Sequence, residues 1–149
     1  MIGALAANTL LLPQPGYVLT LILQLLFYTL AGTGSISGGV TVNANGKLSP
    51  GNSIGTLTLG VPPTLNGTVV MEIDTTQSPS NDVLNVTSGT LTAGGRLVVT
   101  NLPGSTLALG NSFKLFSADN YYGDFTETNL PALTGIRALA ALLVLGLHA

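Results

Sequence analysis

The sequence predicts an all-β protein built as a stacked solenoid, with a β-sandwich as the alternative. Three observations support this fold class. Apolar and polar residues alternate in short runs, and Gly, Asn, Ser or Pro separates one run from the next. Charged residues make up only 7% of the chain, against about 25% in an ordinary soluble domain. Hydrophobic residues make up 46%, so the chain is not of the disordered class.

Composition changes twice along the 149 residues and divides the chain into three segments. Residues 1–31 are an apolar leader or N-terminal cap, and residues 32–133 are the predicted β-solenoid segment. Residues 134–149 are rich in Ala and Leu, which predicts an apolar C-terminal helix. The total length is that of one domain.

The middle segment contains a series of short predicted strands rich in Thr and Val. β-branched residues favour strands over helices, and Gly and Asn in the gaps allow tight turns. The predicted strands cover residues 39–43, 56–59, 68–73, 83–86, 90–92, 96–100 and 112–116. Low charge favours the solenoid over the sandwich, because in-register stacking would place like charges above one another.

The N-terminal run at residues 17–31 is apolar but shorter than the about 20 residues of a membrane-spanning helix. A buried helix, or a pair of strands that caps the first turn of the solenoid, is one interpretation. A degenerate signal or a membrane anchor is the other. Pro13 and Pro15 imply that any helix begins after Gly16. Both ends of the solenoid are therefore predicted to be apolar and helical.

Residue usage excludes several classes of function. The chain has no Cys and a single His, which removes thiol nucleophiles and zinc–thiolate sites. Its four Lys and Arg residues are scattered, so a nucleic-acid partner is not expected. We expect no enzyme activity, no cofactor and no metal.

The G-N-S-I-G sequence at residues 51–55 fits the G-x-S-x-G pattern of hydrolases. That pattern requires a strand-to-helix turn and a partner histidine. Here a Thr-Leu-Thr-Leu strand follows, and His148 lies in the apolar tail. The pattern therefore predicts a turn between strands.

Five residues form a candidate ligand face. Glu72 and Asp74 flank Ile73, so on one strand their carboxylates would point the same way, as in a glycosidase pair. Calcium binding with Asp82 is an alternative, and two solvated charges near a strand end are another. The aromatic residues Tyr121, Tyr122 and Phe125 would stack on sugars, or would close the last turn against the core.

The L-S-P-G-N-S-x-G-T-L-T sequence at residues 48–58 is the most specific motif of the chain. Further motifs lie in order at residues 34–43, 70–74, 82–86, 95–100, 113–116 and 122–125. Together they resemble the autotransporter-associated β-strand repeat family of bacterial surface proteins. The resemblance covers residues 32–133 and implies a single-stranded, right-handed parallel β-helix. It also implies secretion and display at the outer membrane of a Gram-negative bacterium, without catalysis.

The C-terminal run resembles the start of the first membrane helix of acyltransferases that O-acylate sugars. Arg137 and His148 fall on the polar positions of that pattern. Only one helix start is present, so the simpler interpretation is an apolar terminal helix in which Arg and His coincide with the pattern.

The sequence therefore predicts a structural or adhesive segment of a secreted bacterial surface protein. A carbohydrate-binding or glycan-processing β-helix is the second hypothesis, and a membrane-anchored fragment is the third. The expected partners are a second copy, through solenoid ends or strand edges, and a glycan or host surface. Membrane contact would involve the apolar termini.

Overall fold

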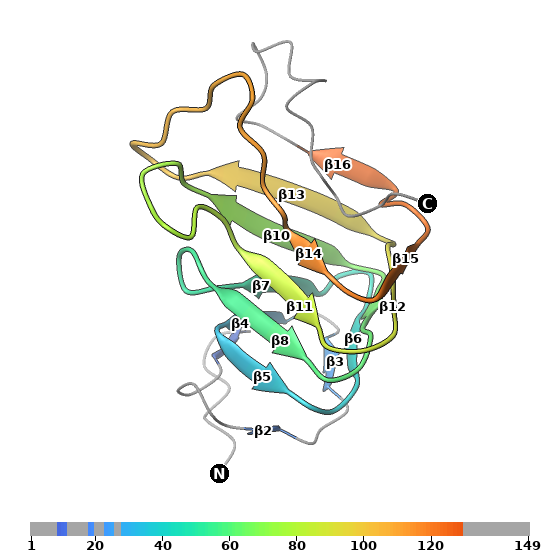
Figure 1. Ribbon diagram of the computed structural model, residues 1–149. Coiled ribbons are helices and arrows are strands. Elements are labelled where there is room, and N and C mark those ends of the chain that lie inside the picture. The colour runs from blue at the N-terminus through green and yellow to red at the C-terminus, as the bar shows by residue number, and fades with distance from the viewer. Residues whose placement is uncertain (1–8, 12–17, 20–22, 26–27, 130–149) are drawn as a thin grey trace.

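The computed structural model describes residues 9–11, 18–19, 23–25 and 28–129, and the strands there form three parallel sheets (Figure 1). Sheet A contains β1 (Thr9–Leu11), β4 (Thr29–Gly32), β7 (Lys47–Pro50), β10 (Thr68–Ile73), β13 (Arg96–Asn101) and β16 (Glu127–Asn129). Sheet B contains β2 (Val18–Leu19), β5 (Gly34–Ile36), β8 (Thr56–Leu59), β11 (Val83–Val86) and β14 (Phe116–Ser117). Sheet C contains β3 (Leu23–Leu25), β6 (Val40–Val42), β9 (Thr64–Leu65), β12 (Thr90–Thr92) and β15 (Asn120–Tyr122).

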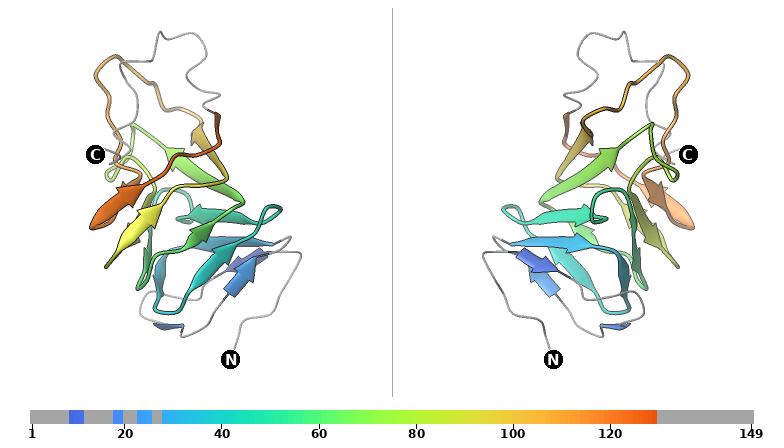
Figure 2. Two further views of the ribbon diagram at one scale, coloured as in Figure 1. Left: turned by 90° about the vertical axis from the view of Figure 1, so that its right-hand side faces the viewer. Right: turned by 90° about the vertical axis from the view of Figure 1, so that its left-hand side faces the viewer.

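The topology is that of a β-solenoid. Consecutive strands enter sheets A, B and C in turn, and we call each such set of three strands a rung. Each strand pairs in parallel with its equivalent in the next rung, as β4 does with β7 and β8 with β11. The rungs climb along one axis from the N-terminal to the C-terminal strands (Figure 2). The all-β solenoid prediction is confirmed, and the sandwich alternative is excluded.

The core fills the inside of the coil with stacked aliphatic side chains. In sheet A, Leu30, Leu48, Val69 and Leu97 stand in register and are fully buried. Equivalent rows from sheets B and C face them, and the buried cluster is continuous from Leu30 to Phe116. Because side chains alternate along each strand, the polar residues between them face outward.

The outward rows are mostly neutral, as the stacking argument requires. In sheet A, Thr68 lies in register between Lys47 of the rung below and Arg96 of the rung above. A threonine thus separates two cations that would otherwise be direct neighbours. In sheet B the equivalent row is Ser35, Thr58, Asn85 and Ser117.

We expect Thr68→Lys to lower the free energy of unfolding by roughly 0.2–1 kcal/mol, because three cations would then stack directly. Thr68→Glu is the matched variant, and its carboxylate should be favourable between Lys47 and Arg96. Urea unfolding at low and high salt measures both effects. We expect the free energies of unfolding of the two variants to converge at high salt, because screening removes the interaction between the charges. Equal stability of the two at low salt would contradict it.

Glycines form a stacked column at the corner between sheets C and A. The carbonyl oxygen of Gly46 accepts a hydrogen bond from Thr68 N at 3.0 Å, and that of Gly67 accepts one from Arg96 N at 2.9 Å. A Cβ added to Gly67 would collide with the carbonyl oxygens of Asn43 and Gly46. The rungs can therefore approach to hydrogen-bonding distance here only because these corner residues have no side chain.

The described residues of the N-terminal segment form strands and not the predicted helix. The described residues of the N-terminal segment include the strands β1, β2, β3 and β4, and the described part of the chain contains no helix. The alternative of capping strands fits better, because β1 and β4 continue sheet A in the register of β7. In-register pairing with the next rung outweighs the helical propensity of a Leu-rich run. The predicted C-terminal helix at residues 134–149 lies outside the described residues.

The predicted strand at residues 112–116 is also corrected. Residues 102–115 form a long loop, and the strand β14 begins only at Phe116. Leu115 is fully buried and its carbonyl oxygen accepts a hydrogen bond from Leu84 N, so the chain rejoins the stack at that residue. Among the described residues, no helix is long and apolar enough to cross a membrane.

Candidate functional site

A buried carboxylate lies at the corner between sheets A and B. Asp82 immediately precedes β11, and its side chain is fully buried. Its Oδ1 accepts a hydrogen bond from Gly55 N at 2.9 Å, and its Oδ2 accepts one from Glu72 N at 2.7 Å. Gly55 belongs to the rung below and Glu72 to the same rung. Asp82 therefore ties two successive rungs together through their backbones.

The G-x-S-x-G sequence forms the turn that receives this carboxylate. It connects β7 to β8, so a strand and not a helix follows it. Gly51 has a φ of +92°, and an added Cβ would collide with Asp82 Oδ1 and the Ser53 carbonyl oxygen. Gly51 N also donates to Gly32 O at 2.9 Å. The prediction of a turn between strands is confirmed, and the strand-to-helix geometry of a hydrolase nucleophile is absent from this turn.

Burial dominates the electrostatics of Asp82. Loss of hydration raises the pKa of its carboxyl to about 7, although the hydrogen bonds from Glu72 N and Gly55 N act in the opposite direction. The nearby Glu72 charge raises the pKa further. Between these two pKa values, 3.8 in the unfolded chain and about 7 in the folded protein, folding therefore favours the protonated form of Asp82.

This proton makes stability depend on pH. Between pH 4 and pH 7 the folded state binds up to one more proton than the unfolded state, so the free energy of unfolding falls as pH rises. The slope is at most about 1.4 kcal/mol per pH unit, in the middle of this range, and flattens above the folded-state pKa. Urea unfolding between pH 4.5 and pH 8 measures it. Asp82→Asn should remove this slope, and a wild-type stability that rises through the window would contradict the prediction.

Glu72 and Asp74 do not form a carboxylate pair. Glu72 is half-buried in β10, whereas Asp74 follows the end of that strand and is buried at the start of the loop that leads to Asp82. Asp74 Oδ1 accepts hydrogen bonds from the hydroxyl and backbone N–H of Thr76, and Oδ2 accepts one from Gln77 Nε2. These bonds, the Thr76 hydroxyl first, hold the pKa of Asp74 below its ordinary value. Its carboxylate is thus occupied in organising a turn.

The calcium alternative also lacks a ligand set. Within the described residues, no three His, Cys, Asp or Glu side chains gather into a group that could hold a metal ion. Each oxygen of Asp82 already accepts a hydrogen bond from a backbone N–H group inside the core, so a cation would have to compete with both donors.

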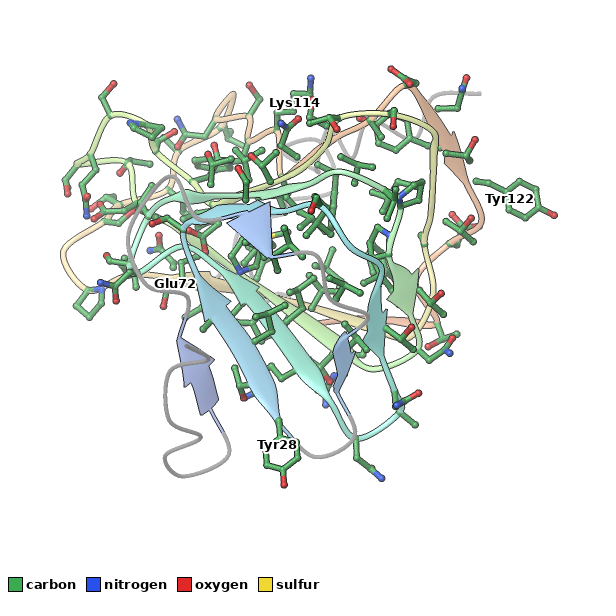
Figure 3. The ribbon with its side chains drawn as sticks, turned by 90° about the horizontal axis from the view of Figure 1, so that it is seen from below. Tyr28, Glu72, Lys114 and Tyr122 are labelled. Carbon is green, nitrogen blue, oxygen red and sulfur yellow. The ribbon has the colours of Figure 1, made fainter. Side chains whose placement is uncertain are left out.

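The three aromatic candidates have different roles in the structure. Tyr121 and Phe125 are half-buried and pack against the core, and the Phe125 ring lies 5.5 Å from the ring of Phe116. The Tyr121 hydroxyl accepts a hydrogen bond from Ala118 N and donates to Phe116 O. These two residues close the last rung. Tyr122 is 72% exposed and points away from the body of the molecule (Figure 3).

The five residues of the predicted ligand face therefore do not share one surface. Glu72 belongs to sheet A and Tyr122 to sheet C, and Figure 3 shows them on opposite sides of the molecule. Only Tyr122 presents most of its side chain to solvent.

Tyr122 stands instead at one end of a polar row on sheet C. Thr41, Thr64, Thr92 and Tyr122 are in register on successive strands, and all four face outward. Sequence reasoning did not find this row. Successive members of the row are separated by 23, 28 and 30 residues, and their alignment depends on the lengths of the intervening corners.

The sequence suggested Asp82 as a calcium ligand, whereas in the structure its carboxyl accepts hydrogen bonds from two backbone N–H groups. The feature of the sequence that could have indicated this role is a single carboxylate directly before the predicted strand at residues 83–86. That position marks the entrance of a strand, where an unpaired backbone N–H of a neighbouring rung needs an acceptor. The identity of the donors follows only from the stacking.

We compared the chain with known protein families, curated proteins and solved structures. No family model, no curated protein and no solved structure matches this chain.

Proposed function

We propose that this chain is a non-enzymatic structural and adhesive segment of a secreted bacterial surface protein, similar to the passengers of Gram-negative autotransporters. The observation that carries the proposal is the in-register stacking of β4, β7, β10 and β13 and of their equivalents in sheets B and C. A solenoid of this kind extends a chain along one axis with a continuous core.

The buried polar groups support a scaffold role. The side chains of Asp82 and Asn81 both bond to backbone groups. Asp82 accepts hydrogen bonds from Gly55 N and Glu72 N. The Asn81 amide donates to the carbonyl oxygens of Asp82 and Lys114. Asp74 binds its own turn. A group that is fully engaged in holding backbone is not free to act on a substrate, so these residues stabilise the coil.

The open edges of the sheets support association with another β-structure. In the described part of the chain, sheets A, B and C end at β16, β14 and β15, and each of these strands has a neighbour on one side only. Such edges pair readily with another strand. Self-association through solenoid ends is therefore part of the proposal.

Surface display tests the proposed function. The full chain, with an N-terminal epitope, is placed between a signal peptide and an outer-membrane anchor in a Gram-negative host. We expect the epitope on intact cells, and we expect the segment to resist trypsin at concentrations that degrade a destabilised control. Gly67→Ala serves as that matched control, because it disrupts the stacking. Accumulation of a folded, protected chain inside the cell would contradict the proposal.

A further inference from the structure

We propose that the outer face of sheet C binds a neutral, extended polysaccharide, with Tyr122 as the stacking platform. This inference goes beyond the scaffold function, which stands whether or not the face binds a ligand.

The face presents a regular array of unused hydrogen-bonding groups. Thr64, Thr90, Thr92 and Asn120 are exposed, and their side chains make no hydrogen bond to the described part of the chain. Neighbouring strands of a parallel sheet lie about 4.8 Å apart, so the hydroxyls of Thr64 and Thr92 repeat at that spacing along the axis. A repeat along the axis fits a linear polymer whose sugar units follow one another in the same direction.

Tyr122 supplies the apolar contact that a sugar ring needs. Its backbone is fixed, because its carbonyl oxygen accepts a hydrogen bond from Ala93 N at 2.8 Å. The next residue, Gly123, has a φ of +73°, and an added Cβ would lie 2.9 Å from Ala93 O. The side chain is 72% exposed on this anchored backbone. A tyrosine ring on a fixed backbone has only two side-chain torsions to restrict when a ligand stacks on it, so the loss of conformational entropy is small.

The charge of the face selects a neutral ligand. The outward residues of the described strands β6, β9, β12 and β15 of sheet C are Thr41, Thr64, Thr90, Thr92, Asn120 and Tyr122, and Asn43 and Asn66 directly follow β6 and β9; none of them is acidic or basic. Asp119, at the nearby corner, uses its Oδ2 to accept a hydrogen bond from Gly89 N. An anionic glycan would meet no cation here, whereas hydroxyl groups would meet hydroxyl and amide partners.

Affinity gel electrophoresis of the full chain tests this inference, with hydroxyethylcellulose as the extended neutral probe and soluble starch as the coiled one. We expect hydroxyethylcellulose to retard the chain and Tyr122→Ala to weaken binding at least tenfold. Thr92→Val, which replaces a hydroxyl by a methyl group, should weaken it severalfold. Tyr28→Ala is the matched control, because Tyr28 is a partly exposed tyrosine that precedes β4 and lies away from Tyr122 (Figure 3).

Three results would overturn the inference. They are no retardation by hydroxyethylcellulose, equal retardation of the wild type and Tyr122→Ala, or stronger retardation by starch. Circular dichroism checks that each variant keeps the wild-type β spectrum. If Tyr122→Ala loses that spectrum, the binding of Thr92→Val decides whether the inference holds. Surface display is measured separately, so a chain that is displayed but binds no polysaccharide refutes only the present inference.

Discussion

Gly67→Ala is expected to destabilise the protein by several kcal/mol. The added Cβ would collide with the carbonyl oxygens of Asn43 and Gly46, which belong to the backbone of the rung below and cannot rotate away. Relief requires the rungs to separate, which would break the hydrogen bond from Thr68 N to Gly46 O. Overpacking of a well-packed site typically costs about 1–3 kcal/mol, and here a backbone hydrogen bond is lost as well.

Thermal and urea unfolding of the purified chain measure this effect. Gly39→Ala is the matched control, because an added Cβ at Gly39 meets nothing within 4 Å and its φ is not in the left-handed region. We expect the control to unfold within about 0.5 kcal/mol of the wild type, as surface substitutions usually do. If the two variants were equally stable, the corner of sheets C and A would not be packed as described.

Asp82→Ala is expected to lower the free energy of unfolding by about 3–5 kcal/mol at pH 6. The substitution leaves Gly55 N and Glu72 N without their acceptor in a buried corner, and each unsatisfied group costs about 1–3 kcal/mol. It also leaves a cavity next to Gly51. Asp82→Asn should cost less, because its amide keeps one acceptor while presenting a donor to the other N–H group.

Asp119→Ala is the control for Asp82→Ala. Asp119 also accepts one backbone hydrogen bond, from Gly89 N at 2.9 Å, but its carboxylate is exposed, so water can replace it. We expect a clearly smaller loss of stability. Equal losses in the two variants would mean that burial of Asp82 between the rungs does not set its contribution.

The alternation of apolar and polar residues was sufficient to predict the fold class and several strand positions. The prediction of residues 68–73 coincides with β10, and that of residues 83–86 with β11, because buried apolar residues occupy every second position of both strands without interruption. Short strands such as β9 (Thr64–Leu65) carry too few residues to show a period, so stacking on β6 defines them.

The N-terminal strands and the long loop show where local signals fail. The Leu-rich run at residues 17–31 has a helical propensity, but the pairing of Thr29 with Lys47 and of Leu30 with Leu48 extends sheet A. Ser112 and Phe113 alternate with Lys114 and Leu115 like a strand, yet the chain returns to the stack only at Leu115. In both cases tertiary contacts decided the outcome, and a single sequence does not contain them.

The candidate site was predictable by residue type and not by geometry. The spacing of Glu72 and Asp74 is correct for one strand, but β10 ends at Ile73 and Asp74 turns away to bind Thr76 and Gln77. Tyr122 was identified as an aromatic that would contact sugar. Which threonines lie beside Tyr122 depends on the number of residues in each rung. The corners differ in length, so this number cannot be read from the sequence.

Cysteine cross-linking tests the central claim, that the rungs stack in parallel register, most directly. The chain has no natural Cys, so a pair of substitutions reports on one contact. Thr58 and Asn85 are register partners on the outer face of sheet B, at a separation that a disulfide can bridge. Thr58→Cys with Asn85→Cys should therefore oxidise to an intramolecular disulfide in the folded protein. Thr58→Cys with Thr92→Cys, on different sheets, should remain reduced. Efficient cross-linking of the second pair but not of the first would contradict the solenoid.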